Sequence, residues 1–209
     1  MIGEYFDMLE DWKRLPAYKL EVRIDSLVGF ALPRVIELKY GLHTKIIIPE
    51  LPIRLGTVHP EHEGKNFCER SYKLDFYIRT TCGHNLFIEF KSDSGSRREE
   101  QDDYLQRAAK VKMKAIVEGI LQISKVTSFK QKYAHLLEKL RQVQLIDEAT
   151  ALIDSEDIRI IYIQPKRLER DLGKEVIEYV QLADYIQRGF PDSEFMKRLS
   201  VSLQKWAND

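Results

Sequence analysis

Cysteine and long apolar runs are both scarce in this chain of 209 residues. Cys68 and Cys82 are the only cysteines, so we expect no disulfide framework and a location in the reducing cytoplasm. Apolar runs such as Ile46–Ile48 are far shorter than the ~18 residues that a membrane span requires. Glu4 and Asp7 stand where a secretory signal would carry basic residues. The sequence therefore predicts a globular cytoplasmic protein without a membrane segment.

Net charge is absent too, because 33 basic and 33 acidic residues cancel. This balance argues mildly against nucleic-acid binding, but the charge is segregated along the chain. Residues 105–141 carry nine Lys or Arg against two Glu, a net charge of +7, whereas the charged residues of 147–157 are all acidic. Arg107, Lys110 and Lys114 follow helical spacings of three and four, which predicts a shared basic face. That face is a candidate for binding phosphates, and a merely solvated helix face is the alternative.

Three segments predict strands at the centre of the fold. Residues 44–55 are rich in Ile but contain two prolines, which favours an edge strand. Residues 71–79 and 86–92 alternate in polarity around a turn centred on Gly83, which predicts an antiparallel hairpin. A further short apolar run at 158–163 is typical of a buried strand.

Helical periodicity surrounds these strands. The helices that we expect cover residues 16–39, 105–123, 129–143, 176–186 and 195–206. Pro33 is expected to kink or split the first of them. The order of elements predicts an α/β protein with a mixed central sheet flanked by helices. We expect a single domain over residues 1–209, with its core at about 18–163 and C-terminal helices within 172–206.

The hairpin carries the one arrangement that resembles a functional site. Glu89 and Lys91 are two residues apart and project from one face of their strand. A turn centred on Gly83 would set Asp75 opposite Lys91, so that Asp75 and Glu89 lie diagonally on the same face. Two carboxylates and a backbone carbonyl are ligands that Mg²⁺ accepts, and an adjacent Lys can stabilise charge that develops on a phosphate.

These residues resemble the PD-(D/E)XK nuclease superfamily, which has the restriction-endonuclease-like fold. Lys73-Leu74-Asp75 on one strand and Glu89-Phe90-Lys91 on the next follow a helix and precede another, as in that superfamily. The resemblance implies that Asp75, Glu89 and the carbonyl of Phe90 bind Mg²⁺, with Mn²⁺ able to replace it, and that Lys91 is the catalytic lysine. The chain departs from the superfamily's pattern at Leu74, which stands in the place of its proline.

The resemblance also implies several supporting residues. Many members add an acid from the first helix, for which Glu21 is our choice and Glu37 the alternative. Gln101 begins an element similar to the superfamily's Gln-x-x-Tyr motif. The remaining candidates are basic residues that would contact phosphates, namely Arg97 and Arg98 together with Arg107, Lys110 and Lys114.

The function that follows is a metal-dependent nuclease, with a DNA endonuclease as the first choice. Its partner would be nucleic acid, and a homodimer is left open. The alternative is a catalytically inactive module of the same fold that serves in binding or assembly. A third interpretation is an unrelated α/β protein in which Glu89 and Lys91 form only a surface ion pair. The segment from His59 to Glu63 could hold zinc, but a polar loop is the preferred interpretation because no second ligand pair is recognisable.

Overall fold

The computed structural model describes residues 2–12, 15, 19–62, 70–93, 99–148, 150–152 and 157–208. The chain forms two compact units. The first unit contains Met1–Thr44, Ile88–Arg97 and Ile161–Asp209, and the second contains Lys45–Phe87 and Arg98–Ile160. Each unit is described by itself below.

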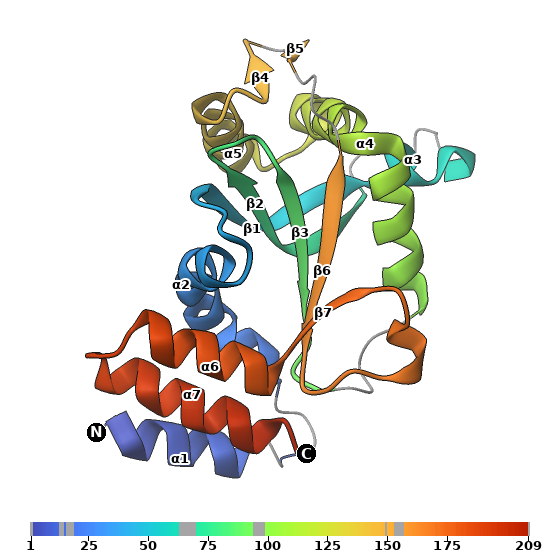
Figure 1. The fold of residues 1–209 in the computed structure, drawn as a ribbon. Helices are drawn as coiled ribbons and strands as arrows, with labels where there is room; N and C mark the ends of the chain where they lie inside the picture. Colours follow the sequence, from blue (N-terminus) through green and yellow to red (C-terminus); the bar gives the residue numbers. More distant parts are fainter. Residues whose placement is uncertain are drawn as a thin grey trace. The chain divides into compact units, whose positions relative to one another are not determined.

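A mixed five-stranded sheet flanked by helices confirms the predicted α/β class (Figure 1). Its hydrogen-bonded order is β1-β2-β3-β6-β7. The strands are β1 (Thr44–Arg54), β2 (Ser71–Thr80), β3 (Asn85–Phe90), β6 (Ile158–Gln164) and β7 (Glu175–Glu178). β1 stands at the end of this order, so the edge position predicted from its two prolines is confirmed.

Helices α1 (Ile2–Trp12), α2 (Glu21–Tyr40), α6 (Tyr179–Gly189) and α7 (Glu194–Trp206) belong to the first unit. α7 packs against both α1 and α6, as Figure 1 shows, and the indole N–H of Trp206 donates a hydrogen bond to Glu10 Oε2 at 2.6 Å. α2 runs without a break through Pro33, so the predicted split does not occur. Gly41 ends α2 in the left-handed conformation at φ 68°, and its N–H donates to the Glu37 carbonyl.

The predicted helix at 176–186 is wrong at its start. Val176 lies on β7, which pairs in parallel with β6 from Ile161 opposite Glu175 to Gln164 opposite Glu178, and the helix begins only at Tyr179. The backbone groups of this segment are therefore satisfied by the neighbouring strand rather than by a helical turn. This end of the sheet positions Tyr179, which becomes important at the site.

The second unit contains the turn between β2 and β3. The N–H of Thr80 donates to the His84 carbonyl at 3.0 Å, and the N–H of Gly83 donates to the Thr80 carbonyl at 3.1 Å. Gly83 has φ 90°, as expected for a three-residue turn closed by a bulge. Thr80 therefore lies opposite His84, a register two residues away from the predicted one, and odd-numbered residues still share a face.

The other elements of the second unit are α3 (Leu55–Val58), η1 (Pro60–His62), α4 (Glu99–Val126), α5 (Lys130–Gln142), β4 (Ile146–Asp147) and β5 (Thr150–Ala151). The helices expected at 105–123 and 129–143 are present as α4 and α5, and residues 127–129 separate them. Lys112 interrupts α4 with φ 69° and ψ 170°. Helical spacing consequently does not extend from Lys110 to Lys114, and the prediction that Arg107, Lys110 and Lys114 share one helix face is wrong. None of the helices in the described ranges has the length and apolarity to cross a bilayer.

Candidate functional site

The site lies at the end of β3, within the first unit, where Glu89, Phe90 and Lys91 follow one another. Glu89 is 1% exposed and Lys91 is 4% exposed. Burial of both charges costs desolvation energy that only a close partner can offset. Each of the two charges is the partner of the other, because Lys91 Nζ lies 2.9 Å from Glu89 Oε1. The surface ion pair of the third sequence interpretation is therefore wrong, since the pair is buried.

The backbone of Lys91 is held from two sides. Its N–H donates to the carbonyl of Ile163 on β6 at 2.8 Å, and its carbonyl accepts a hydrogen bond from the Tyr179 hydroxyl at 2.7 Å. The ring of Tyr179 also stacks on the ring of Phe90, with centroids 6.0 Å apart and planes inclined by 20°. These contacts fix the direction in which the side chains of this strand end project.

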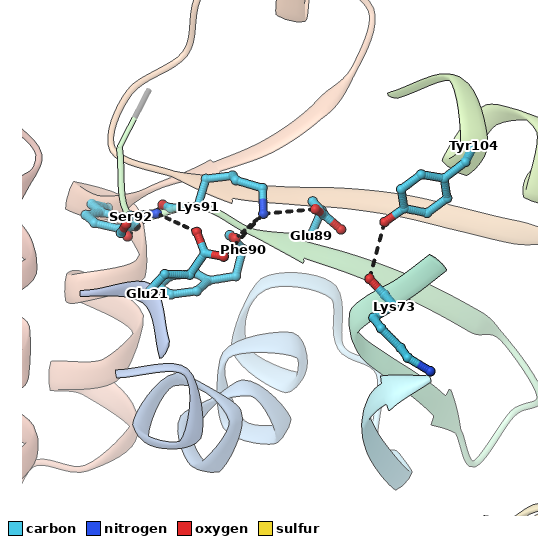
Figure 2. Close-up of polar contacts among 8 residues, drawn as sticks. Glu21, Lys73, Glu89, Phe90, Lys91, Ser92 and Tyr104 are labelled. Atoms are coloured by element: carbon cyan, nitrogen blue, oxygen red, sulfur yellow. Dashed lines mark hydrogen bonds and ion pairs between the residues drawn. The ribbon is translucent and has the colours of Figure 1, made fainter. Parts of the chain in front are cut away.

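Three oxygen atoms surround the ammonium of Lys91, as Figure 2 shows. They are Glu89 Oε1 at 2.9 Å, the Phe90 carbonyl at 3.0 Å and Glu21 Oε1 at 3.5 Å. The second oxygen of Glu21 accepts a hydrogen bond from the Ser92 N–H at 3.4 Å. Two carboxylates and one carbonyl thus converge on a single cation.

Glu21 is the first residue of α2, and its position has a local cause. The first turn of a helix exposes unpaired N–H groups and favours negative charge. Leu20 at the N-cap supplies no side-chain hydrogen bond to that turn, and Glu21 is its one acidic residue. The chain therefore gains from a carboxylate at this end of α2, which is the end that reaches Lys91.

Of the two candidate acids on α2, the structure brings Glu21 and not Glu37 to Lys91. Glu37 accepts a hydrogen bond from Arg34 Nη1 at 2.6 Å and lies 3.5 Å from His43 Nδ1. The bond from Arg34 is the main reason that the pKa of Glu37 lies below its ordinary value. Glu37 thus takes part in a separate surface cluster.

The donor set around Lys91 fits a divalent metal by its chemistry. Carboxylate and carbonyl oxygens are the ligands that Mg²⁺ and Mn²⁺ prefer, and the ammonium marks the point where a cation is stabilised. Glu89, Glu21 and the Phe90 carbonyl are the groups that would hold such an ion. Among the described residues, no group of three or more His, Cys, Asp or Glu side chains is disposed to hold a metal ion. A metal here would therefore rely on the Phe90 carbonyl as well as on acids.

Tyr179 is a residue of the site that sequence reasoning missed. Burial raises the pKa of its hydroxyl well above the ordinary value, and the negative charges of Glu21 and Asp93 raise this pKa further. The hydroxyl therefore stays protonated and remains a donor to the Lys91 carbonyl. A single Tyr after a short strand carries no sequence signal for this role, because its partner is 88 residues away.

The second unit holds the other predicted site residues. Asp75 lies on β2 and is partly exposed, and Gln101 lies in the first turn of α4 and is partly exposed. The Tyr104 hydroxyl, three residues after Gln101, donates to the Lys73 carbonyl at 3.5 Å, as Figure 2 shows. The ring of Tyr104 stacks on that of Tyr72 at 4.4 Å. The start of α4 is thereby attached to β2, the strand that carries Asp75.

The predicted phosphate contacts are only partly described. Arg97 and Arg98 lie outside the described residues. Arg107 Nε donates to Asp103 Oδ2 at 2.8 Å, and this bond is the main reason that the pKa of Arg107 is raised. Lys110 and Lys114 are exposed on the two sides of the break in α4.

His59, the first residue of the zinc alternative, has hydrogen-bond partners at both ring nitrogens. Nδ1 lies 3.1 Å from Glu61 Oε1 and Nε2 lies 3.2 Å from the Tyr72 hydroxyl. The ring thus links η1 to β2 by hydrogen bonds. Pro60–His62 form the 3-10 helix η1 where a loop was expected, and Glu63 lies outside the described residues.

Comparison with known proteins adds no relative to this description. No family model matches the chain, and neither a curated protein nor a solved structure matches it.

Proposed function

We propose that this protein is a metal-dependent nuclease of the PD-(D/E)XK type, with a restriction-endonuclease-like fold, that hydrolyses phosphodiester bonds in DNA. One observation carries the proposal: Glu89, Glu21 and the Phe90 carbonyl converge on the buried ammonium of Lys91. A fold gains little from burying a charged cluster that apolar residues could replace. A cation-binding role gives this cluster a purpose.

Each residue of the first unit has a part in the proposed reaction. Glu89, Glu21 and the Phe90 carbonyl would hold Mg²⁺, or Mn²⁺ in its place. The bound metal would supply a Lewis acid for the phosphate and would lower the pKa of a water ligand. Lys91 would direct its ammonium to the attacking water or to the charge on the pentavalent phosphate. Tyr179 would keep the strand end in place through the Lys91 carbonyl.

We include Asp75 among the proposed metal ligands because the resemblance of Lys73-Leu74-Asp75 to the superfamily's pattern implies that role. Gln101 would support Lys91 or the substrate.

The proposed contacts to the phosphate backbone come from basic residues of and before α4: Arg97, Arg98, Arg107, Lys110 and Lys114. Phosphate contacts of this kind position nucleic acid and carry no sequence information. Of these, Lys110 and Lys114 offer exposed ammonium groups in the described chain.

A catalytically inactive binding or assembly module of the same fold is the second candidate. The observation that favours it is the ion pair itself, since Lys91 already neutralises Glu89 at 2.9 Å. A cluster that is electrically complete can serve as a structural tie. The two candidates differ in whether a divalent cation can replace the ammonium.

The acids of α2 provide a matched test, because the side chains of Glu21 and Glu37 are 30% and 34% exposed. We expect Glu21→Gln to weaken Mn²⁺ binding by about 10- to 100-fold, the range typical of lost supporting interactions at metal sites. Glu37→Gln should bind Mn²⁺ as the parent does. Isothermal titration of each variant with Mn²⁺ measures the difference, and equal affinities or the reverse ranking would contradict the proposed ligand set.

A further inference from the structure

The junction of α4 and α5, residues 125–132, presents an aromatic ring to solvent in a fixed orientation. We call this segment the α4–α5 tip. Phe129 is 61% exposed, and Val126 beside it is exposed as well. Thr127 between them is buried, its N–H donates to the Ile123 carbonyl at 2.9 Å and its hydroxyl accepts from the Phe129 N–H at 3.2 Å. These hydrogen bonds tie down the backbone of the α4–α5 tip at Thr127 and Phe129.

The surroundings of this ring are positively charged. No acidic residue occurs between Glu118 and Glu138, whereas Lys125, Lys130 and Lys132 all fall within the α4–α5 tip. Lys132 Nζ lies over the ring of Phe129, 5.5 Å from its centroid. The α4–α5 tip thus combines a flat apolar face with a nearby cation.

Lysines in the first turn of α5 are electrostatically unfavourable for that helix. The N-terminus of a helix favours negative charge, yet the first turn of α5 has no acid and carries lysines instead. Lys130 is accommodated because its ammonium donates to the carbonyls of Ser124 and Lys125 at 3.1 and 2.7 Å, at the end of α4. Lys132 is exposed and its ammonium lies over the ring of Phe129, so its charge favours an anionic partner.

We propose that the α4–α5 tip binds single-stranded nucleic acid, with a base stacked on Phe129 and flanking phosphates near Lys125 and Lys132. Aromatic side chains beside basic ones are the usual platform for single strands, because every base presents a π-face. An acidic peptide would match the lysines but leave the ring unused. A membrane surface requires a broad apolar face, whereas the exposed residues of α5 next to Phe129 are Lys130, Gln131 and Lys132.

The inference deepens the proposed function, on which it rests for the cleavage step, by naming single strands or single-stranded segments as the substrate class. It applies to binding alone and needs no metal. The α4–α5 tip and the Glu89–Lys91 cluster can consequently be tested independently.

The test is the affinity of the full-length protein for a fluorescent oligothymidylate of about 20 nucleotides, measured by anisotropy in EDTA. We expect Phe129→Ala to weaken binding by about tenfold or more and Phe129→Tyr to restore it. Lys132→Gln should reduce the salt dependence by about 0.7, the value for one contact to a single strand. The matched control is Phe30→Ala, since Phe30 is 66% exposed and lies in the first unit. This control should bind as the parent does.

Three results would overturn the inference: absence of binding by the parent, unchanged affinity of Phe129→Ala, or an equal loss in Phe30→Ala. Binding to phosphatidylserine vesicles that depends on Phe129, without binding to the oligonucleotide, would instead identify a lipid surface. Cleavage with Mg²⁺ by a parent that does not use Phe129 for binding would reject this inference and leave the nuclease intact. Binding through Phe129 without any cleavage would support this inference and reject the proposed nuclease activity.

Discussion

Replacement of Lys91 by Met is expected to lower the free energy of unfolding by about 3–5 kcal/mol in metal-free buffer at neutral pH. Glu89, which is 1% exposed, would remain buried without the ammonium that lies 2.9 Å away, and breaking a buried ion pair costs about this much. Mn²⁺ should restore much of the stability, because a divalent cation can then occupy the position among the same oxygens. Urea unfolding in EDTA and in Mn²⁺ measures both effects.

The matched control is the double variant Glu89→Gln/Lys91→Met, which removes both charges and keeps similar shapes. Its stability in EDTA should be close to that of the parent, since replacing a buried pair with neutral groups is often neutral. Mn²⁺ should stabilise it less than it stabilises Lys91→Met. If Mn²⁺ left Lys91→Met as unstable as it is in EDTA, the cluster would be a structural tie, and the inactive module would be the better account.

Replacement of Asp75 by Asn is expected to abolish most of the stabilisation by Mn²⁺ while changing metal-free stability little. Asp75 is partly exposed on β2, and Asn has the same shape. At a hundred times its dissociation constant, Mn²⁺ would stabilise the parent by about 2.7 kcal/mol. A hundredfold loss of affinity would reduce this to about 0.4 kcal/mol at the same concentration. Melting temperatures with and without Mn²⁺ measure the difference.

Asp184→Asn provides the control, because Asp184 is an exposed acid whose recorded partner is Arg188 on the same helix. Its response to Mn²⁺ should equal that of the parent. An Asp75→Asn protein that melts with the same Mn²⁺ shift as the parent would remove Asp75 from the ligand set.

The sequence predicted which side chains share a face but not how deeply they are buried. Alternation along the strand correctly placed Glu89 and Lys91 on one face, since a strand has a period of two. Their side chains are indeed in contact. The burial of Lys91 depends on Ile163 and Tyr179, which are distant in the sequence. Local periodicity carries no information about such contacts, so the alternation alone is also compatible with an exposed pair.

Two errors have local physical causes. The turn was centred on Gly83 in the prediction, but Gly83 adopts φ 90° as the bulge residue, which moves the register by two. Val176 fits a helical stripe as well as a strand, and its pairing with Tyr162 on β6 determines that it is a strand residue. In both cases the outcome depends on pairing between segments and not on the residue types alone.

The central claim is that this chain cleaves phosphodiester bonds with a metal held beside Lys91. The most direct measurement is the conversion of supercoiled plasmid, and of single-stranded DNA, by the purified protein in Mg²⁺ and in EDTA. Lys91→Met serves as the inactive protein, and circular dichroism in the same Mg²⁺ buffer verifies that it is folded. The account predicts nicked or shortened DNA only with the parent and only in Mg²⁺. Intact DNA with the parent in Mg²⁺ and in Mn²⁺, or equal cleavage by Lys91→Met, would contradict it.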